Sequence, residues 1–302
     1  ILLLMAGVLA LVWNIAELPV LAVPLSLERT LENVHIVNPG QPTLAHQTVV
    51  IEDGVITSIK PAERKARRNI ARYLLPGLID SHVHSPRFQP DEELFHTLYL
   101  MHGVTTVRNM GDGGRVFELG ASIDKGERIG PRMLGCGMPL DGPQGSDNVI
   151  ELETADDATE AVADLHEAGA RCIKVYPMLP ADVFLAVKKK AKNLGLPVVG
   201  RMNNRLGIEG ASMDEVHHLH GVIDVVSPGY RMRDVTDWLK AWKKKFSKER
   251  IDLTVRMAQI HESAHVPSLV GVGYLASRKL KRIPRPKMRL LPDWYSDTNG
   301  TR

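Results

Sequence analysis

Cysteine is scarce in this sequence, which contains only Cys136 and Cys172 among its 302 residues. Two cysteines without a Cys-x-x-Cys partner exclude the disulfide framework that holds many small secreted domains together. Both residues stand in short apolar runs that are typical of strands. The sequence therefore predicts two small buried core residues and not a thiolate ligand or a nucleophile.

An excess of charge of one sign is also lacking, because 38 basic and 35 acidic residues give a formal net charge of +3. The lysine runs at residues 188–190 and 243–245 stand among helix-forming residues, as is typical of a solvated helix face. The sequence thus predicts no nucleic-acid partner. The composition, with 44% hydrophobic residues, indicates a globular protein with a large core.

Long hydrophobic runs are absent except at the start, where residues 1–13 are apolar and hydrophobicity resumes up to residue 23. This pattern predicts that residues 1–26 are a signal peptide or a membrane anchor, two alternatives that the sequence leaves open. We expect an exported (periplasmic or extracellular) or membrane-anchored protein. The absence of an initial Met and of a basic n-region leads us to expect that the original N-terminus lies upstream.

The sequence pattern over residues 27–74 predicts a small β unit. Three β-like runs occur at residues 33–37, 48–52 and 55–59, and Asp53-Gly54 between the last two is a strong signal for a hairpin turn. A basic stretch, residues 64–72, then links this unit to the rest of the chain.

Residues 75–302 alternate between apolar strands and helix-length segments, which predicts parallel βα units. No glycine-rich phosphate-binding motif follows the first strand, so a barrel is favoured over an open nucleotide-binding sheet. In such a barrel the chemistry is expected at the carboxyl ends of the strands. The predicted strands are residues 78–82, 105–109, 133–137, 172–176, 198–202, 216–219 and 266–270, and the clearest helices are 92–101, 155–168 and 181–194.

His82-Val83-His84 stands at the end of the first predicted strand. Alternate residues of a strand point the same way, so both imidazoles can bind one metal ion such as Zn²⁺. A His pair at the rim of the core is the alternative interpretation.

The sequence motifs around this pair resemble those of the amidohydrolase superfamily, in particular its imidazolonepropionase-like and Xaa-Pro-dipeptidase-like branch. Residues 75–84 (LPGLIDSHVH) are similar to its opening barrel strand, residues 102–108 (HGVTTVR) to its second, and residues 130–132 (GPR) to its third. The resemblance implies an α/β fold, namely a (β/α)8-type metal-dependent hydrolase barrel with a small N-terminal β-sandwich-like unit. It also implies one or two divalent metal ions, typically Zn²⁺, and a metal-activated water that hydrolyses a C–N bond of a cyclic amide or small peptide.

The resemblance places the metal ligands at His82, His84, Lys174 and His218. Lys174 stands where this branch often has a carboxylated lysine that bridges two metals; the alternative is a lysine whose stem packs at the barrel rim. His217 is expected to point the other way and to have a packing role or to support a ligand. Three further histidines match no ligand position and are expected at the surface or rim: His220, His261 and His265.

Two departures from the family pattern concern the second metal. Arg201 stands where the resemblance places a fifth-strand His, and a guanidinium cannot bind a metal ion. No Gly-Thr-Asp motif follows residues 266–269, so we expect a barrel without its last strand, either truncated at both ends relative to the family or a degenerate copy.

Three interpretations follow. The first is a metal-dependent amidohydrolase acting on a small molecule or dipeptide. The second is a catalytically impaired member of the fold, a binding protein in which Arg201 replaces the charge of a metal. The third is a fragment without independent function. Arg108 and Tyr176 lie near predicted strand ends and are candidates either for substrate contact or for a structural place at the rim.

Overall fold

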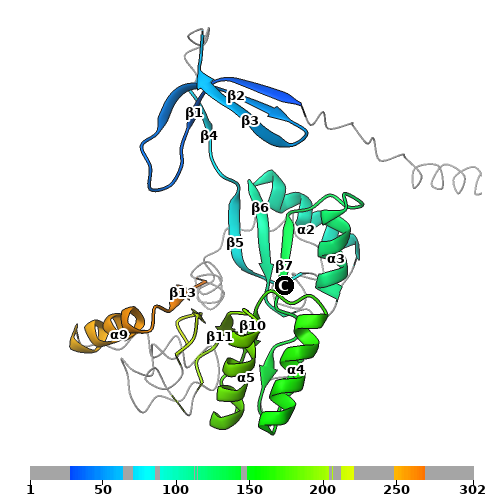
Figure 1. Ribbon diagram of the computed structural model, residues 1–302, viewed down its shortest axis with the longest axis vertical. Helices are drawn as coiled ribbons and strands as arrows, with labels where there is room; N and C mark the ends of the chain where they lie inside the picture. Colours follow the sequence, from blue (N-terminus) through cyan, green and yellow to red (C-terminus); the bar gives the residue numbers. More distant parts are fainter. Residues whose placement is uncertain are drawn as a thin grey trace, which may run out of the picture. The chain divides into compact units, whose positions relative to one another are not determined.

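The computed structural model describes residues 28–63, 71–85, 89–111, 113, 115–143, 148–203, 206, 212–220 and 248–268. The chain divides into two compact units, Ile1–Pro76 and Gly77–Arg302 (Figure 1). The predicted leader, the lysine run at residues 243–245 and the chain after residue 268 lie outside the described residues. Within the described ranges, no helix combines the length and the apolar character needed to cross a membrane.

The first unit contains a four-stranded sheet in the order β3-β2-β1-β4. The predicted hairpin is confirmed, because β2 and β3 pair antiparallel up to Glu52 and Val55. The two residues between them, Asp53 and Gly54, have φ values of 48° and 75°, as the two central residues of a tight hairpin turn require. The strands are β1 (Arg29–Ile36), β2 (Leu44–Glu52), β3 (Val55–Pro61) and β4 (Arg72–Leu74).

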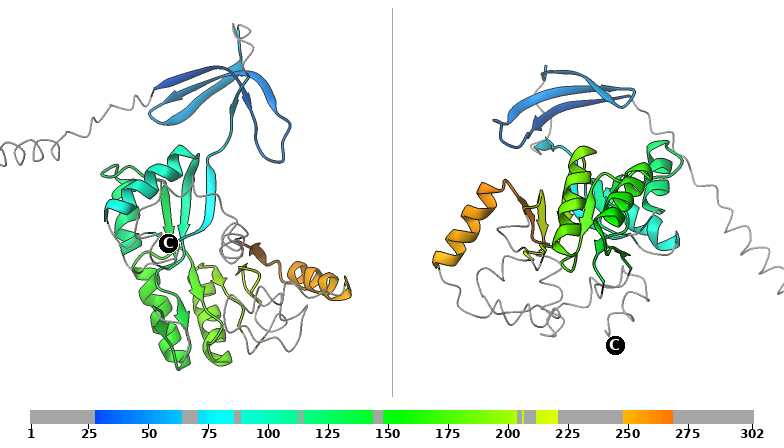
Figure 2. Two further views of the ribbon diagram at one scale, coloured as in Figure 1. Left: turned by 180° about the vertical axis from the view of Figure 1, so that it is seen from behind. Right: turned by 60° about the horizontal axis from the view of Figure 1, so that its bottom comes forward.

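The second unit begins with a three-stranded parallel sheet, β5-β6-β7, accompanied by two helices. Helix α2 contacts β6, and helix α3 contacts β7 (Figure 2). Gly77 precedes β5 at a point where a Cβ would overlap the side chain of Thr105, so only glycine fits there. The elements are β5 (Leu78–Val83), α2 (Gln89–Met101), β6 (Val104–Asn109), α3 (Arg115–Asp124) and β7 (Arg132–Gly135).

A six-stranded parallel sheet follows, in the order β13-β12-β11-β10-β8-β9. All seven strands and all three helices that the sequence predicts in this unit overlap observed elements, which confirms an α/β unit with parallel sheets. The elements are β8 (Leu140–Asp141), β9 (Ile150–Glu151), α4 (Ala155–Glu167), β10 (Ile173–Val175), α5 (Ala181–Asn193), β11 (Val198–Gly200), β12 (Glu215–His217), α9 (Lys248–Ile260) and β13 (Ala264–Val266).

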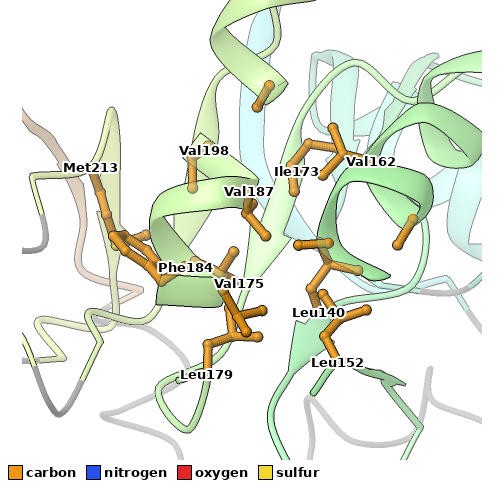
Figure 3. Packing of buried hydrophobic residues seen from close by; sticks show 14 of the residues in the cluster. Leu140, Leu152, Val162, Ile173, Val175, Leu179, Phe184, Val187, Val198 and Met213 are labelled. Atoms are coloured by element: carbon orange, nitrogen blue, oxygen red, sulfur yellow. The ribbon is translucent and has the colours of Figure 1, made fainter. Parts of the chain in front are cut away.

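The core of the second unit lies where α4 and α5 pack on each other and on the six-stranded sheet (Figure 3). Helix α4 begins with a capping box, in which the Thr154 side chain and Asp157 satisfy each other's backbone N–H groups. The apolar faces of the two helices then cover fully buried strands. The fully buried apolar side chains include Leu140, Val162, Ile173, Val175, Leu179, Val183, Phe184 and Val187.

The two cysteines correct the sequence analysis. Both are buried as predicted, but Cys136 and Cys172 form a disulfide across 36 residues, with their Cα atoms 4.6 Å apart. Cys136 directly follows β7, and Cys172 directly precedes β10. Arg171 donates its backbone N–H to the carbonyl of Gly135, so the backbones of the two segments already lie in contact. The fold therefore brings together two thiols that are distant in sequence.

Candidate active site

Four imidazoles gather where β5 and β12 end. The ring centre of His82, on β5, lies 4.5 Å from that of His218, 4.8 Å from that of His217 and 5.5 Å from that of His84. The structure thus brings together all three histidines predicted as metal ligands. It also brings His217 into the cluster, where its Nδ1 lies 2.6 Å from Nδ1 of His82.

His217 is connected to an ion pair that the sequence analysis did not identify. Its Nε2 lies 3.1 Å from a carboxylate oxygen of Glu215, which stands two residues earlier on the same face of β12. The carboxylate accepts hydrogen bonds from both terminal nitrogens of Arg108, on β6. The bond from Nη1 to Oε1 is 2.8 Å long. Arg108 also donates its Nε to the carbonyl of Ser81 at 3.0 Å, so it links β5, β6 and β12.

Lys174 stands in the middle of β10, with only 2% of its surface exposed. Its ammonium group donates to the backbone carbonyl of Met110 and lies 5.1 Å from the centre of the Tyr176 ring. Burial of a lysine is costly unless the amine is paired or modified, and here the Met110 carbonyl accepts its hydrogen bond.

Arg201 comes directly after β11 and turns toward the same region. Gly200 before it has φ 127°, and a Cβ there would overlap the carbonyl oxygen of Val175, so β11 can approach β10 only with glycine at this position. The Arg201 guanidinium lies 4.4 Å from the centre of the Tyr176 ring, a cation–π contact. The Tyr176 ring thus lies close to two cationic side chains, Lys174 and Arg201.

The electrostatics keep His82, His217 and His218 neutral near pH 7. Burial, with smaller contributions from His218 and Lys174, holds the pKa of His82 far below its ordinary value. Burial and then Arg201 lower the pKa of His218 to about 3, and the same two causes lower the pKa of His220 to about 4. Burial would raise the pKa of Glu215, but the hydrogen bonds with His217 and Arg108 outweigh it and lower that pKa to about 2. An ionised carboxylate thus stands beside neutral imidazoles.

The turn after β12 adopts an unusual backbone conformation. His218 and Leu219 have φ values of 59° and 55°, a left-handed region that non-glycine residues seldom occupy. Strain of this kind gathers at functional sites, where the surrounding structure over-determines it. His220, in the same turn, is buried, which corrects its expected place at the surface or rim. His261, directly after α9, and His265, on β13, are partly exposed.

The donor atoms of this cluster are of a type that divalent metal ions prefer. Imidazole is a preferred ligand of Zn²⁺ and similar ions, and His82, His84 and His218 supply three. Among the described residues, however, no group of three or more His, Cys, Asp or Glu side chains has the geometry of a ready metal site. The cationic Arg201, which already lowers the pKa of His218, opposes a second dication.

Residues 73–228 match the amidohydrolase family, and the chain belongs to this family. No curated protein sequence matches it. Solved structures with the same fold include a bottromycin amidohydrolase, with a TM-score of 0.60 and 22% identity over 71% of this chain and 48% of that one. A putative prolidase from Bifidobacterium longum has a TM-score of 0.54 and 26% identity over 64% and 54% of the two chains. A Xaa-Pro dipeptidase with methionine bound in its active site has a TM-score of 0.58 and 18% identity over 84% and 70%.

The chain spans about half the length of the first two of these structures. Family membership confirms the predicted relationship to amidohydrolases. The metal ligands His82, His84, Lys174 and His218 stay predictions, which the clustering of these side chains supports.

Proposed function

We propose that this protein is a metal-dependent hydrolase that cleaves a C–N bond in a cyclic amide or a small peptide. The observation that carries the proposal is the cluster of imidazoles around the partly buried His82 at the carboxyl ends of parallel strands, where barrel enzymes hold their catalytic groups. The two parallel sheets are proposed to belong to one (β/α)8-type barrel. Membership of the amidohydrolase family supports both statements.

His82, His84 and His218 are proposed to hold one divalent ion, with Lys174 as a fourth, anionic ligand once CO₂ has carboxylated its amine. When bound, such an ion supplies Lewis acidity, which polarises a carbonyl group and makes water a nucleophile at neutral pH. Lys174 itself requires deprotonation before it can react with CO₂, because a protonated amine has no lone pair.

The substrate is proposed to be small, with a Xaa-Pro dipeptide as the first choice. Two of the similar structures carry the names prolidase and Xaa-Pro dipeptidase, which supports this class. The free carboxylate of a dipeptide also suits the cationic Arg201, which lies at the edge of the His cluster over Tyr176.

The test is hydrolysis of a panel of Xaa-Pro dipeptides and cyclic imides by the full chain, with and without added Zn²⁺. We expect turnover that requires the metal and is lost in His82→Ala. His166→Ala is the matched control, because His166 is an exposed histidine on α4, and it should retain full activity. Turnover that persists in His82→Ala, or in the presence of a chelator, would contradict the proposal.

A second candidate function is a non-catalytic protein that binds an anion. The observation that favours it is Arg201, for which no salt bridge to a carboxylate occurs among the residues that the structure describes. Calorimetric titration with N-acetylproline, compared with its uncharged amide, tests this function. Binding of the acid alone, its loss in Arg201→Gln and its retention in the exposed control Arg171→Gln, without metal or turnover, would favour this candidate over the hydrolase.

We also propose that the protein is exported or membrane-anchored. The apolar residues 1–23 and the Cys136–Cys172 disulfide support this location, because disulfides persist in oxidising compartments. Fractionation of cells that express a tagged chain should find the protein outside the cytoplasm. A cytoplasmic pool in which both thiols react with an alkylating agent would contradict this part of the proposal.

A further inference from the structure

Four side chains from three strands form a continuous line of polar contacts, Arg108–Glu215–His217–His82. Arg108 comes from β6, His82 from β5, and the other two from β12. Side chains of Arg108 and Glu215 are only 14% and 20% exposed, and His217 is fully buried. Every link lies within hydrogen-bonding distance. The line of contacts thus connects the Arg108–Glu215 ion pair to His82, an imidazole of the proposed metal site.

The first link fixes the proton of His217. A carboxylate held by the two terminal nitrogens of an arginine is ionised and can only accept hydrogen bonds. Nε2 of His217 lies 3.1 Å from Oε2 of Glu215, so a lone pair on that nitrogen would face a negative oxygen. The proton of a neutral His217 therefore resides on Nε2, and Nδ1 is left as an acceptor. Arg108 is the only competing donor in contact with Nε2 among the described residues, at the longer distance of 3.5 Å.

The second link then fixes the proton of His82. Two imidazole nitrogens 2.6 Å apart must share one proton between them, because two lone pairs at that distance repel and two protons collide. Since Nδ1 of His217 is the acceptor, Nδ1 of His82 carries the proton. A neutral His82 then has its lone pair on Nε2, the only nitrogen left to bind a cation.

We propose that Arg108, Glu215 and His217 are positioning residues that hold His82 in the Nδ1–H tautomer with its Nε2 lone pair available to a metal ion. His217 uses both ring nitrogens within the line and is therefore not itself a ligand. The tautomer follows from the contacts alone, whereas its role in metal binding rests on the proposed function. A carboxylate that orients a ligating histidine usually acts on it directly; here a second imidazole stands between them.

The first test is long-range ¹H–¹⁵N correlation NMR of the histidines in the metal-free full chain at neutral pH, with His82→Gln and His217→Gln to assign the signals. We expect His217 to be protonated on Nε2 alone and His82 on Nδ1 alone. A proton on Nδ1 of His217 would overturn the proposal. This measurement needs no metal and no activity, so it stands or fails separately from the proposed function.

The second test measures Zn²⁺ affinity by competition with a chromophoric chelator. Glu215→Gln should weaken Zn²⁺ binding by roughly 10- to 100-fold, as loss of an orienting group around a metal ligand does. Glu92→Gln is the matched control, because buried Glu92 forms an equivalent two-point ion pair with Arg115 between α2 and α3. The control should keep the affinity of the parent chain. Equal losses in both variants would show a general structural effect and would overturn the positioning role.

Discussion

Removal of the Cys136–Cys172 disulfide is expected to destabilise the second unit without damage to its core packing. The perturbation is the double substitution Cys136→Ala, Cys172→Ala. Both side chains are buried against Met110 and Val199, and alanine leaves no unsatisfied polar group there. The cross-link joins the end of β7 to the start of β10 and so joins the two parallel sheets.

The magnitude follows from the length of the loop that the bond closes. A separation of 36 residues corresponds to about 4 kcal/mol of denatured-state entropy at 25 °C. For a unit of this size such a loss lowers Tm by roughly 10 °C. Urea denaturation, followed by circular dichroism, measures the free energy of unfolding of the double variant and of the parent chain.

Addition of a reductant provides the internal control. The parent chain should lose about the same free energy of unfolding in excess dithiothreitol, whereas the double variant should not respond to it. If the variant and the parent differ by less than about 1 kcal/mol, and reductant changes neither, then the two sulfurs are not bonded and the cross-link between the sheets does not exist.

Other substitutions test the core, the strand contact and the electrostatics. Phe184→Ala removes a fully buried ring and should cost about 3–5 kcal/mol in urea denaturation, whereas the exposed neighbour Leu185→Ala should change stability by less than about 0.5 kcal/mol. Gly200→Ala should destabilise the protein by more than about 2 kcal/mol because its Cβ meets the backbone of β10, whereas Gly195→Ala, with open space around it, should cost only about 1 kcal/mol; thermal unfolding compares the two. The pKa of the buried His220 is lowered to about 4, so the folded protein binds this proton at a lower pH than the unfolded chain, in which the pKa is about 6.5. The free energy of unfolding of the metal-free protein should therefore fall by roughly 3 kcal/mol from this residue as the pH drops from 6.5 to 4, and His220→Gln should flatten that dependence. Pairs that fail to differ in these ways would contradict the corresponding contact.

Periodicity was sufficient to predict the parallel βα units, because fully buried strands such as β10 and β11 are short apolar runs with helices between them. Several of the elements that the prediction left out have weak patterns. Strands β8 and β9 have two residues each, and α9 carries charged residues on most of its turns. Such elements form because the rest of the sheet is already in place, which a local pattern does not record.

The candidate site shows the same limit. His82, His84 and His218 were identified because each stands near the end of a predicted strand. The partnership of Arg108 with Glu215 was missed, since these residues are 107 positions apart and meet only through the tertiary fold. A signal was present in the period of β12: Glu215 and His217 stand two apart and so share a face. His217 was expected to point away from the ligands, but the turn at His218 lets both imidazoles contact His82.

Bound metal per folded protein tests the central claim most directly. The full chain, dialysed against Zn²⁺ and then against metal-free buffer, should retain about one ion per chain by elemental analysis, while His82→Ala should retain none and His166→Ala should match the parent. Folded protein, verified by a cooperative unfolding transition, that retains no metal would contradict the account and would favour the anion-binding function of Arg201.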